Sequence, residues 1–257
     1  MLRSLFAALA VSAAPAGAQA QLPAALDEAL SRAPADAPTP QRVALRMRVD
    51  GQSILVEIRP GAEGEDAAYT LLQPGSPDQL SDAQAEMWAG FDEDPDDDAA
   101  PTGAPSQTYA VGGFDADGLR AAIGAQADLV REEAGRLIYA FAPQSLPGQG
   151  GEDGGREALL DNLAGEIEVD AERGQVTRVS FDLIESFKPH LAARITEFGL
   201  AQRFVHEPAI DGPRFSGLTL TMAGSAVFQP FSQTLEIELV SVRYPGAGAL
   251  EAGAESP

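Results

Sequence analysis

The chain contains no cysteine among its 257 residues. This absence excludes a disulfide framework, a thiolate metal site, a cysteine nucleophile and an anchor attached to a lipid-modified cysteine. Histidine is scarce too, because only His190 and His206 occur. They fall on different expected elements, so a zinc site would need carboxylates from elsewhere in the chain. We therefore expect no metal and no other cofactor.

Local catalytic motifs are missing as well. The chain has no Gly-x-Ser-x-Gly elbow and no glycine-rich phosphate loop. The alternating acids at 92–98 resemble a calcium loop, but its sixth position is Asp97 rather than glycine and its twelfth is Gly103 rather than glutamate. We therefore predict that the protein is not an enzyme.

Positive charge is in short supply. Acidic residues number 39 against 17 basic ones, which gives a formal net charge of -22. A surface of this sign repels phosphate backbones and opposes adhesion to anionic lipid headgroups. The composition therefore excludes nucleic acid as an expected partner and indicates a solubilising acidic surface.

The N-terminus has the pattern of a secretory signal peptide. Arg3 supplies a positive start, residues 5–11 form an apolar stretch, and Ala18-Gln19-Ala20 offers small residues for cleavage. We predict a signal peptide over residues 1–20, cleaved near Ala20. No later segment reaches about 18 uninterrupted apolar residues, so no transmembrane segment is expected. A periplasmic location is the simplest prediction, and full secretion fits the same pattern.

The remaining chain divides into three expected parts. Residues 21–40 predict a short helix, over 22–32, followed by a proline-rich linker. Residues 41–244 predict a curved β-sheet domain with helical insertions. The small-residue segment 245–257 is expected to be a disordered tail.

Alternation of apolar and polar residues is the main signal within the expected sheet domain. One hairpin is predicted over 43–58, with its turn at Asp50-Gly51, and another over 165–183, with its turn at 170–174. Further strands are expected at 67–72, 127–131, 136–141, 195–205, 218–223, 226–228 and 233–244.

Short helices interrupt these strands. The capping-box pattern SDAQ at 81–84 predicts a helix over 81–90. A second helix is predicted to begin at Asp115 or Asp117. Between the two helices, the acidic run at 91–105 is expected to form a disordered or mobile loop.

These elements predict an α+β fold that is mainly antiparallel β. About ten strands are expected, with two to four short helices. A flat sheet of that size would expose a large apolar face, so we expect a single strongly curved sheet, an incomplete barrel, covered by the short helices.

Apolar side chains are the remaining candidates for a functional site. Their ordinary role is the core, but some of them could line a cavity between the sheet and the helices, which would accept an acyl chain. Each buried methylene would contribute about 0.8 kcal/mol. The ligand-lining candidates are Val43, Leu45, Met47, Trp88, Leu137, Tyr139, Phe141, Phe181 and Phe228.

The order of elements resembles that of a known family. The phrases LAGEIEVDAERGQVTRVSFDL, at 163–183, and RITEFGLAQRF, at 194–204, are similar in style to the paired strands of the LolA/LolB-like periplasmic lipoprotein-carrier superfamily. The resemblance implies an incomplete β-barrel closed by helices around a lipid-binding cavity. The acidic loop at 91–105 is an insertion relative to that family, and no individual functional residue is carried over.

Three functions remain open, in this order. The first is an exported periplasmic protein that binds a lipid or lipoprotein acyl chain in a cavity between sheet and helices. The second is a non-catalytic structural or interaction protein of the cell envelope, with a filled core and an envelope protein as its partner. The third is a hydrolase or metal-dependent enzyme in which His190 or His206 meets carboxylates.

Overall fold

The computed structural model of the chain describes residues 22–32, 38–61, 67–92, 114–146, 159–190, 192–227, 229–245 and 250–251. The expected signal peptide at 1–20 and Phe228 lie outside these residues, as does most of the acidic loop at 91–105.

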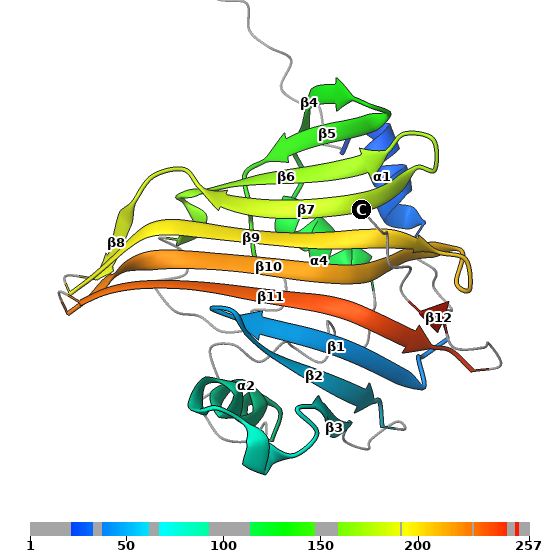
Figure 1. The fold of residues 1–257 in the computed structure, drawn as a ribbon. Helices are drawn as coiled ribbons and strands as arrows, with labels where there is room; N and C mark the ends of the chain where they lie inside the picture. The colour runs from blue at the N-terminus through cyan, green and yellow to red at the C-terminus, as the bar shows by residue number, and fades with distance from the viewer. Residues whose placement is uncertain are drawn as a thin grey trace, which may run out of the picture.

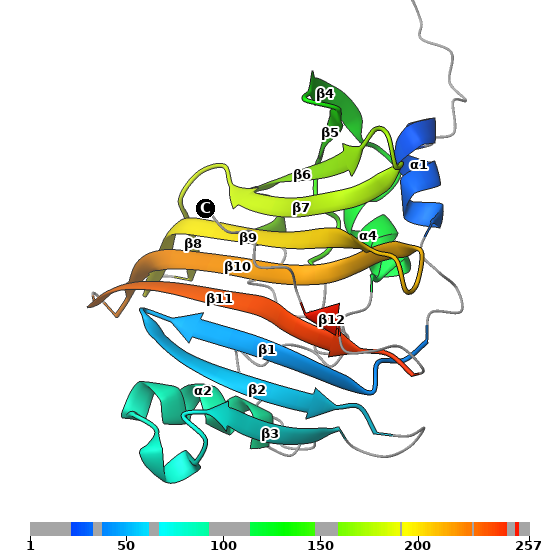
Figure 2. The ribbon, with the colours of Figure 1, turned by 45° about the vertical axis from the view of Figure 1, so that its right-hand side comes forward.

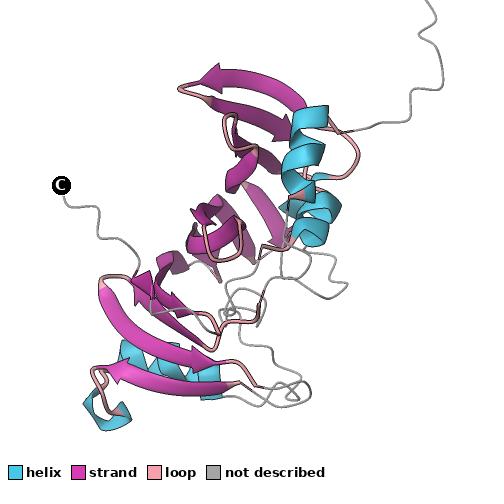
Figure 3. Ribbon diagram, turned by 90° about the vertical axis from the view of Figure 1, so that its right-hand side faces the viewer, coloured by secondary structure: helices cyan, strands magenta, loops and turns pink. Residues whose placement is uncertain are grey.

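The described residues form one antiparallel sheet of twelve strands that does not close (Figure 1). Ten strands follow the order β3-β2-β1-β11-β10-β9-β7-β6-β5-β4, while β12 pairs with β11 and β8 with β9. Viewed along the strands, the sheet curves around a concave face (Figure 3). The strands are β1 Arg42–Val49, β2 Gln52–Arg59, β3 Ala68–Gln73, β4 Asp128–Glu133, β5 Arg136–Phe141, β6 Leu163–Asp170, β7 Gln175–Leu183, β8 Phe187–His190, β9 Ala193–Glu207, β10 Gly212–Ala226, β11 Gln229–Arg243 and β12 Leu250–Glu251.

The helices are short and few in the described chain. They are α1 Ala24–Ser31, the 3-10 turn η1 Pro77–Gln79, α2 Asp82–Asp92 and α4 Ala116–Ile123. Helix α1 contacts α4 and β7, whereas α2 contacts β2 and β3. The predicted class, a mainly antiparallel α+β fold with one curved, half-barrel-like sheet and short helices, is confirmed.

Both expected helix caps are present. The Asp115 carboxylate accepts a hydrogen bond from the Gly118 N–H at 2.8 Å, which caps α4. At the start of α2, the Ser81 N–H donates to the Gln84 side chain at 3.0 Å, and the Gln84 N–H donates to the Ser81 hydroxyl at 3.4 Å. These two reciprocal bonds are the capping box that the sequence predicts.

Helix α2 continues past the predicted end at Gly90. A glycine within a helix costs about 1 kcal/mol relative to alanine, which favours an earlier end. In the structure the helix extends to Asp92, because Phe91 packs on Tyr69 of β3 with 5.3 Å between ring centroids. This tertiary contact stabilises the last turn.

Side chains on β1 alternate between the two faces of the sheet. Leu45 lies opposite Val56 of β2 and Leu239 of β11, and all three are buried on the concave face. On the convex face, Arg46 pairs with Glu238 at 2.8 Å. The alternation therefore separates an apolar inner face from a charged outer one.

Strand β10 differs from the prediction. Strands at 218–223 and 226–228 are expected, but one strand runs from Gly212 to Ala226, and the turn follows at Val227, which has a φ of 49°. The expected interruption between residues 223 and 226 is absent, and Gly224 lies inside the ladder at a bulge. A Cβ there would lie 2.2 Å from the Arg194 carbonyl oxygen, so the glycine allows β9 to approach closely.

Two further strands were not expected. Strand β8, Phe187–His190, pairs with the start of β9. In the segment expected to be a disordered tail, Leu250 and Glu251 form β12 and pair with Val242 and Ser241 of β11. Strand β12 forms because β11 offers it a pairing partner, and the local composition of residues 245–257 does not reveal that partner.

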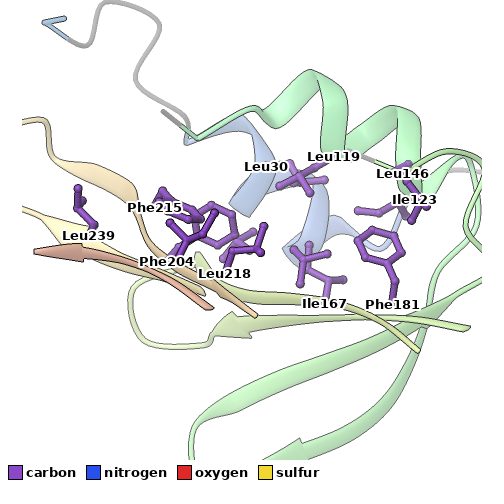
Figure 4. Packing of buried hydrophobic residues seen from close by; sticks show 14 of the residues in the cluster. Leu30, Leu119, Ile123, Leu146, Ile167, Phe181, Phe204, Phe215, Leu218 and Leu239 are labelled. Atoms are coloured by element: carbon purple, nitrogen blue, oxygen red, sulfur yellow. The ribbon is translucent and has the colours of Figure 1, made fainter. Parts of the chain in front are cut away.

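The core lies between the concave face and the helices. Figure 4 shows Leu30 of α1 with Leu119 and Ile123 of α4 facing Ile167 and Phe181 of the sheet. Leu30, Ile167 and Phe181 are each 0% exposed. Burial of this apolar layer holds the helices against the sheet.

Candidate functional site

The predicted ligand-lining residues lie mainly within the packed core. Val43, Leu45, Met47, Tyr139, Phe141 and Phe181 are between 0% and 7% exposed. Leu137 and Trp88 are half-buried, and Phe228 lies outside the described residues.

The buried candidates share the concave face of the sheet, but they lie on strands that are far apart in the sheet order. Strand β1 is four steps from β7 in the sheet order, which at about 4.8 Å per step is roughly 19 Å. Phe141 and Phe181 do meet, edge to face, with 5.8 Å between their centroids. The buried candidates therefore lie in two parts of one continuous core cluster, one group on β1 and one on β5 and β7.

A third set of apolar residues, which the sequence analysis did not select, lies between those groups. Leu220 of β10 is in register with Leu200 of β9 and Leu235 of β11, and Met222 is in register with Phe198. All five side chains are half-buried. We call these residues, Phe198, Leu200, Leu220, Met222 and Leu235, the central apolar row.

The central apolar row shares its face with the core. Leu218 pairs with Ile237, and both are buried on the concave side. Leu220 and Leu235 lie two residues further along the same strands with no bulge between, so they point to the same side. Burial therefore decreases along the central strands, from a fully packed end to a half-covered one.

Strand length accounts for part of this decrease: Phe198 lies beyond the residues that pair with β7, whereas Leu200 is in register with Phe181 of β7 and Leu235 with Val49 of β1. Strands β9, β10 and β11 each have 15 residues, whereas β1 has 8 and β7 has 9. Figures 1 and 2 show the three long strands extending beyond these neighbours at one end. The main helix contacts are with β7 and with β2 and β3, on either side of the three long strands.

The sequence identifies some residues of the central apolar row but not their partial exposure. Alternation within 195–205 and 233–244 marks the apolar positions, but it does not show which end of each strand the helices leave half-covered. That depends on the sheet order, in which β1 lies beside β11 although they are far apart in the chain.

Charged side chains gather away from the central apolar row. The one strongly buried ion pair of the described chain joins Arg214 Nε to Glu207 Oε2 at 3.0 Å, at the fully packed end of β9 and β10. Burial raises the pKa of the neighbouring Tyr244 hydroxyl, and the Glu207 charge raises it further. On the convex face, Glu168 receives hydrogen bonds from Arg136 and Arg178. Hydrophobic contact is therefore the chemistry that the row itself offers.

The structure describes side-chain surroundings for one of the two histidines, His206. His206 Nδ1 lies 3.1 Å from the Gln175 side-chain oxygen. Among the described residues, no group of three or more histidine, aspartate or glutamate side chains could hold a metal ion.

The fold and the central apolar row define a half-barrel-like β protein with a partly open apolar concave face. None of the described helices is long and apolar enough to span a membrane. No protein-family model, no curated protein and no solved structure matches the chain. The resemblance to lipoprotein carriers stays a prediction.

Proposed function

We propose that the protein is an exported, non-catalytic carrier or sensor that binds the acyl chain of a lipid or lipoprotein. The chain lies along the concave face, against the central apolar row. Export to the periplasm is part of this proposal and depends on the signal-peptide pattern over residues 1–20.

The central apolar row is the observation that carries the proposal. All five side chains are half-buried, and four of them, those of Phe198, Leu200, Leu220 and Leu235, pack against the core, so a hydrocarbon laid over them continues that core. Each methylene removed from water contributes about 0.8 kcal/mol, so ten of them supply about 8 kcal/mol before the cost of ordering the chain. No charged partner is needed for that gain.

The proposed site differs from the set of residues that the sequence suggests. Val43 and Phe181 are 0% exposed, since neighbouring side chains already fill the space around them. A bound chain therefore lies over the half-buried residues of β9, β10 and β11 rather than over the enclosed Val43 and Phe181.

A matched pair of substitutions tests this location. Leu220→Glu places a carboxylate in the row, where a bound hydrocarbon would desolvate it, so affinity for the apolar probe N-phenyl-1-naphthylamine should fall at least ~10-fold. Leu129→Glu makes the same change on β4, where the side chain is 52% exposed, and should leave affinity unchanged. Equal affinities for the two variants would place the probe elsewhere.

Native mass spectrometry supplies the second test. Protein purified without detergent should carry a mass increment that chloroform extraction removes and that matches an acylated molecule. Repeated absence of any increment, together with no uptake of the probe, would remove the basis for a carrier.

One observation favours the alternative, an interaction protein of the cell envelope. Edge strand β4 is exposed along its whole length, and Leu129 and Val130 are 52% and 48% exposed. Such an edge can pair with a strand of an envelope protein. Under this alternative, Val130→Lys would abolish capture of the partner while probe binding stays unchanged.

A further inference from the structure

Gln202 is a polar residue in an apolar setting on the concave face. It lies on β9 in register with Val179 of β7 and Leu218 of β10. Its side chain is 2% exposed, and both register neighbours are buried. Along its own strand, Leu200 precedes Gln202 and Phe204 follows it on the same face. An amide at this position is costly to bury without partners.

The Gln202 side chain has an unused hydrogen-bond donor. Its Nε2 is the one buried side-chain nitrogen or oxygen atom of the described residues that has no hydrogen-bond partner. The other buried amide, Gln175, contacts His206, and the buried Arg214 and Glu207 bond to each other. Folded proteins rarely leave such a donor unpaired, because its bond to water is lost without replacement.

The position of Gln202 links this donor to the proposed ligand site. Leu200, the next residue on the same face, belongs to the central apolar row and is half-buried, whereas Phe204, on the other side, is 6% exposed. Gln202 therefore lies at the inner end of the row, where the half-covered surface meets the packed core. A chain laid along the row therefore has its inner end directed toward Gln202.

We propose that Gln202 Nε2 donates a hydrogen bond to a neutral carbonyl oxygen of the ligand, an acyl ester or amide. This inference rests on the proposed function, and it narrows the ligand class. A hydrocarbon without an acceptor leaves the donor unpaired. An ionised fatty acid brings an uncompensated charge to an apolar site, which is costlier still. Arg203 cannot neutralise that charge, because it is adjacent in sequence and so points to the opposite face.

Competition binding with the variant Gln202→Met tests the proposal, since methionine keeps the unbranched shape and removes the donor. Methyl decanoate and N-methyldecanamide should displace N-phenyl-1-naphthylamine from the wild-type protein, and ionised decanoate should be at least ~10-fold weaker. In Gln202→Met, affinity for the ester and the amide should fall ~10-fold, while affinity for the naphthylamine, which has no carbonyl, stays unchanged. The ratio of ester to amide affinity separates a glycerolipid source from an N-acylated one.

The outcomes separate the two proposals. An unchanged ester affinity in Gln202→Met, or an equal loss for ester and naphthylamine, would overturn the role of Gln202 and leave the apolar site standing. Failure of the wild-type protein to bind the naphthylamine would overturn both. If Gln202→Met does not fold, nuclear magnetic resonance of the wild-type side-chain amide replaces it. The Gln202 Nε2 protons should shift downfield with the ester and not with the naphthylamine, and identical shifts would refute the hydrogen bond.

Discussion

Replacing Gly165 with alanine should destabilise the sheet even though alanine is ordinarily better tolerated in a strand interior. Gly165 of β6 lies in register between Phe141 of β5 and Phe181 of β7. The two phenyl rings meet edge to face over it, with 5.8 Å between centroids. A Cβ at Gly165 would lie 2.4 Å from two carbon atoms of the Phe141 ring. The glycine therefore provides the space that this ring occupies.

The magnitude follows from how tightly the Phe141 ring is held. Ordinary carbon contacts lie at about 3.5–4.0 Å, so the ring must move by roughly 1 Å or more. Phe141 is 7% exposed and Phe181 is 0% exposed, so the movement disturbs packed neighbours. Overpacking of this kind costs about 1–3 kcal/mol, and weakening the edge-to-face pair adds about 0.5–1.5 kcal/mol. We expect a loss of about 2–3 kcal/mol and a Tm lower by roughly 4–12 °C.

Thermal unfolding followed by circular dichroism measures this effect. Gly199→Ala is the matched control, because that glycine is also inside a strand but its added Cβ meets only Asp182 Oδ1, at 3.4 Å. The control should stay within about 0.5 kcal/mol of wild type. In a Phe141→Leu background, Gly165→Ala should cost less than half as much as in the wild type. Equal Tm values for the two alanine variants would refute the reasoning.

Three further predictions concern stability. Asp115→Ala removes the cap of α4 and should cost about 1 kcal/mol in urea unfolding. Glu207→Ala leaves Arg214, 9% exposed, without its buried partner and should cost about 3–5 kcal/mol, whereas replacing both residues by leucine and methionine should cost far less. Hydrogen bonds from the turn, first from the Arg173 N–H, lower the pKa of Asp170 below its ordinary value of 3.8. Its stabilisation is therefore present at neutral pH and lost as the pH falls below 3.8, so the stability gap between wild type and Asp170→Asn should narrow in acid.

Each of these three predictions has an outcome that would contradict it. A loss from Asp117→Ala as large as that from Asp115→Ala would mean that helix charge, rather than the cap bond, matters in α4. If replacing both Glu207 and Arg214 destabilised the protein as much as Glu207→Ala alone, the loss could not be attributed to an uncompensated Arg214 charge. If the stability difference between wild type and Asp170→Asn stayed constant from neutral pH into acid, the ionised carboxylate would not be the source of the stabilisation.

The hairpins could be predicted from the sequence because their signal is local. The alternation through 43–58 and the turn at Asp50-Gly51 correspond to β1, β2 and a turn in which both residues have positive φ. The opening of α2 at Ser81 was equally predictable, because a capping box is complete within four residues. These elements also bury their apolar faces, so local and tertiary preferences agree.

The predicted and observed elements differ where a residue distant in sequence determines whether a strand or a turn forms. Val227 takes a turn conformation that non-glycine residues seldom adopt, so the sequence does not mark the turn between β10 and β11. An interruption was expected between residues 223 and 226, but Gly224 lets β9 approach closely and the pairing continues through Ala226. Strand β12 exists through its pairing with β11. None of these contacts is visible in a local window.

The apolar character of the proposed site could be predicted from the sequence, but the residues that form it could not. Selecting large apolar residues identified Val43 and Phe181, which the core encloses completely. Leu200 and Leu220 carry the same alternation, yet only the three-dimensional arrangement of the sheet and the helices shows that they stay half-covered. Gln202 carried no signal at all, because a single glutamine in a strand is ordinarily a surface residue.

Paramagnetic broadening of leucine methyl resonances tests the central claim most directly. A doxyl-labelled methyl stearate added at equimolar concentration should broaden the methyl signals of Leu200, Leu220 and Leu235. It should leave Leu129, which is exposed at the edge of the sheet, sharp. Broadening that is confined to Leu129, or none anywhere at saturating ester, would contradict the binding of an acyl chain on the concave face.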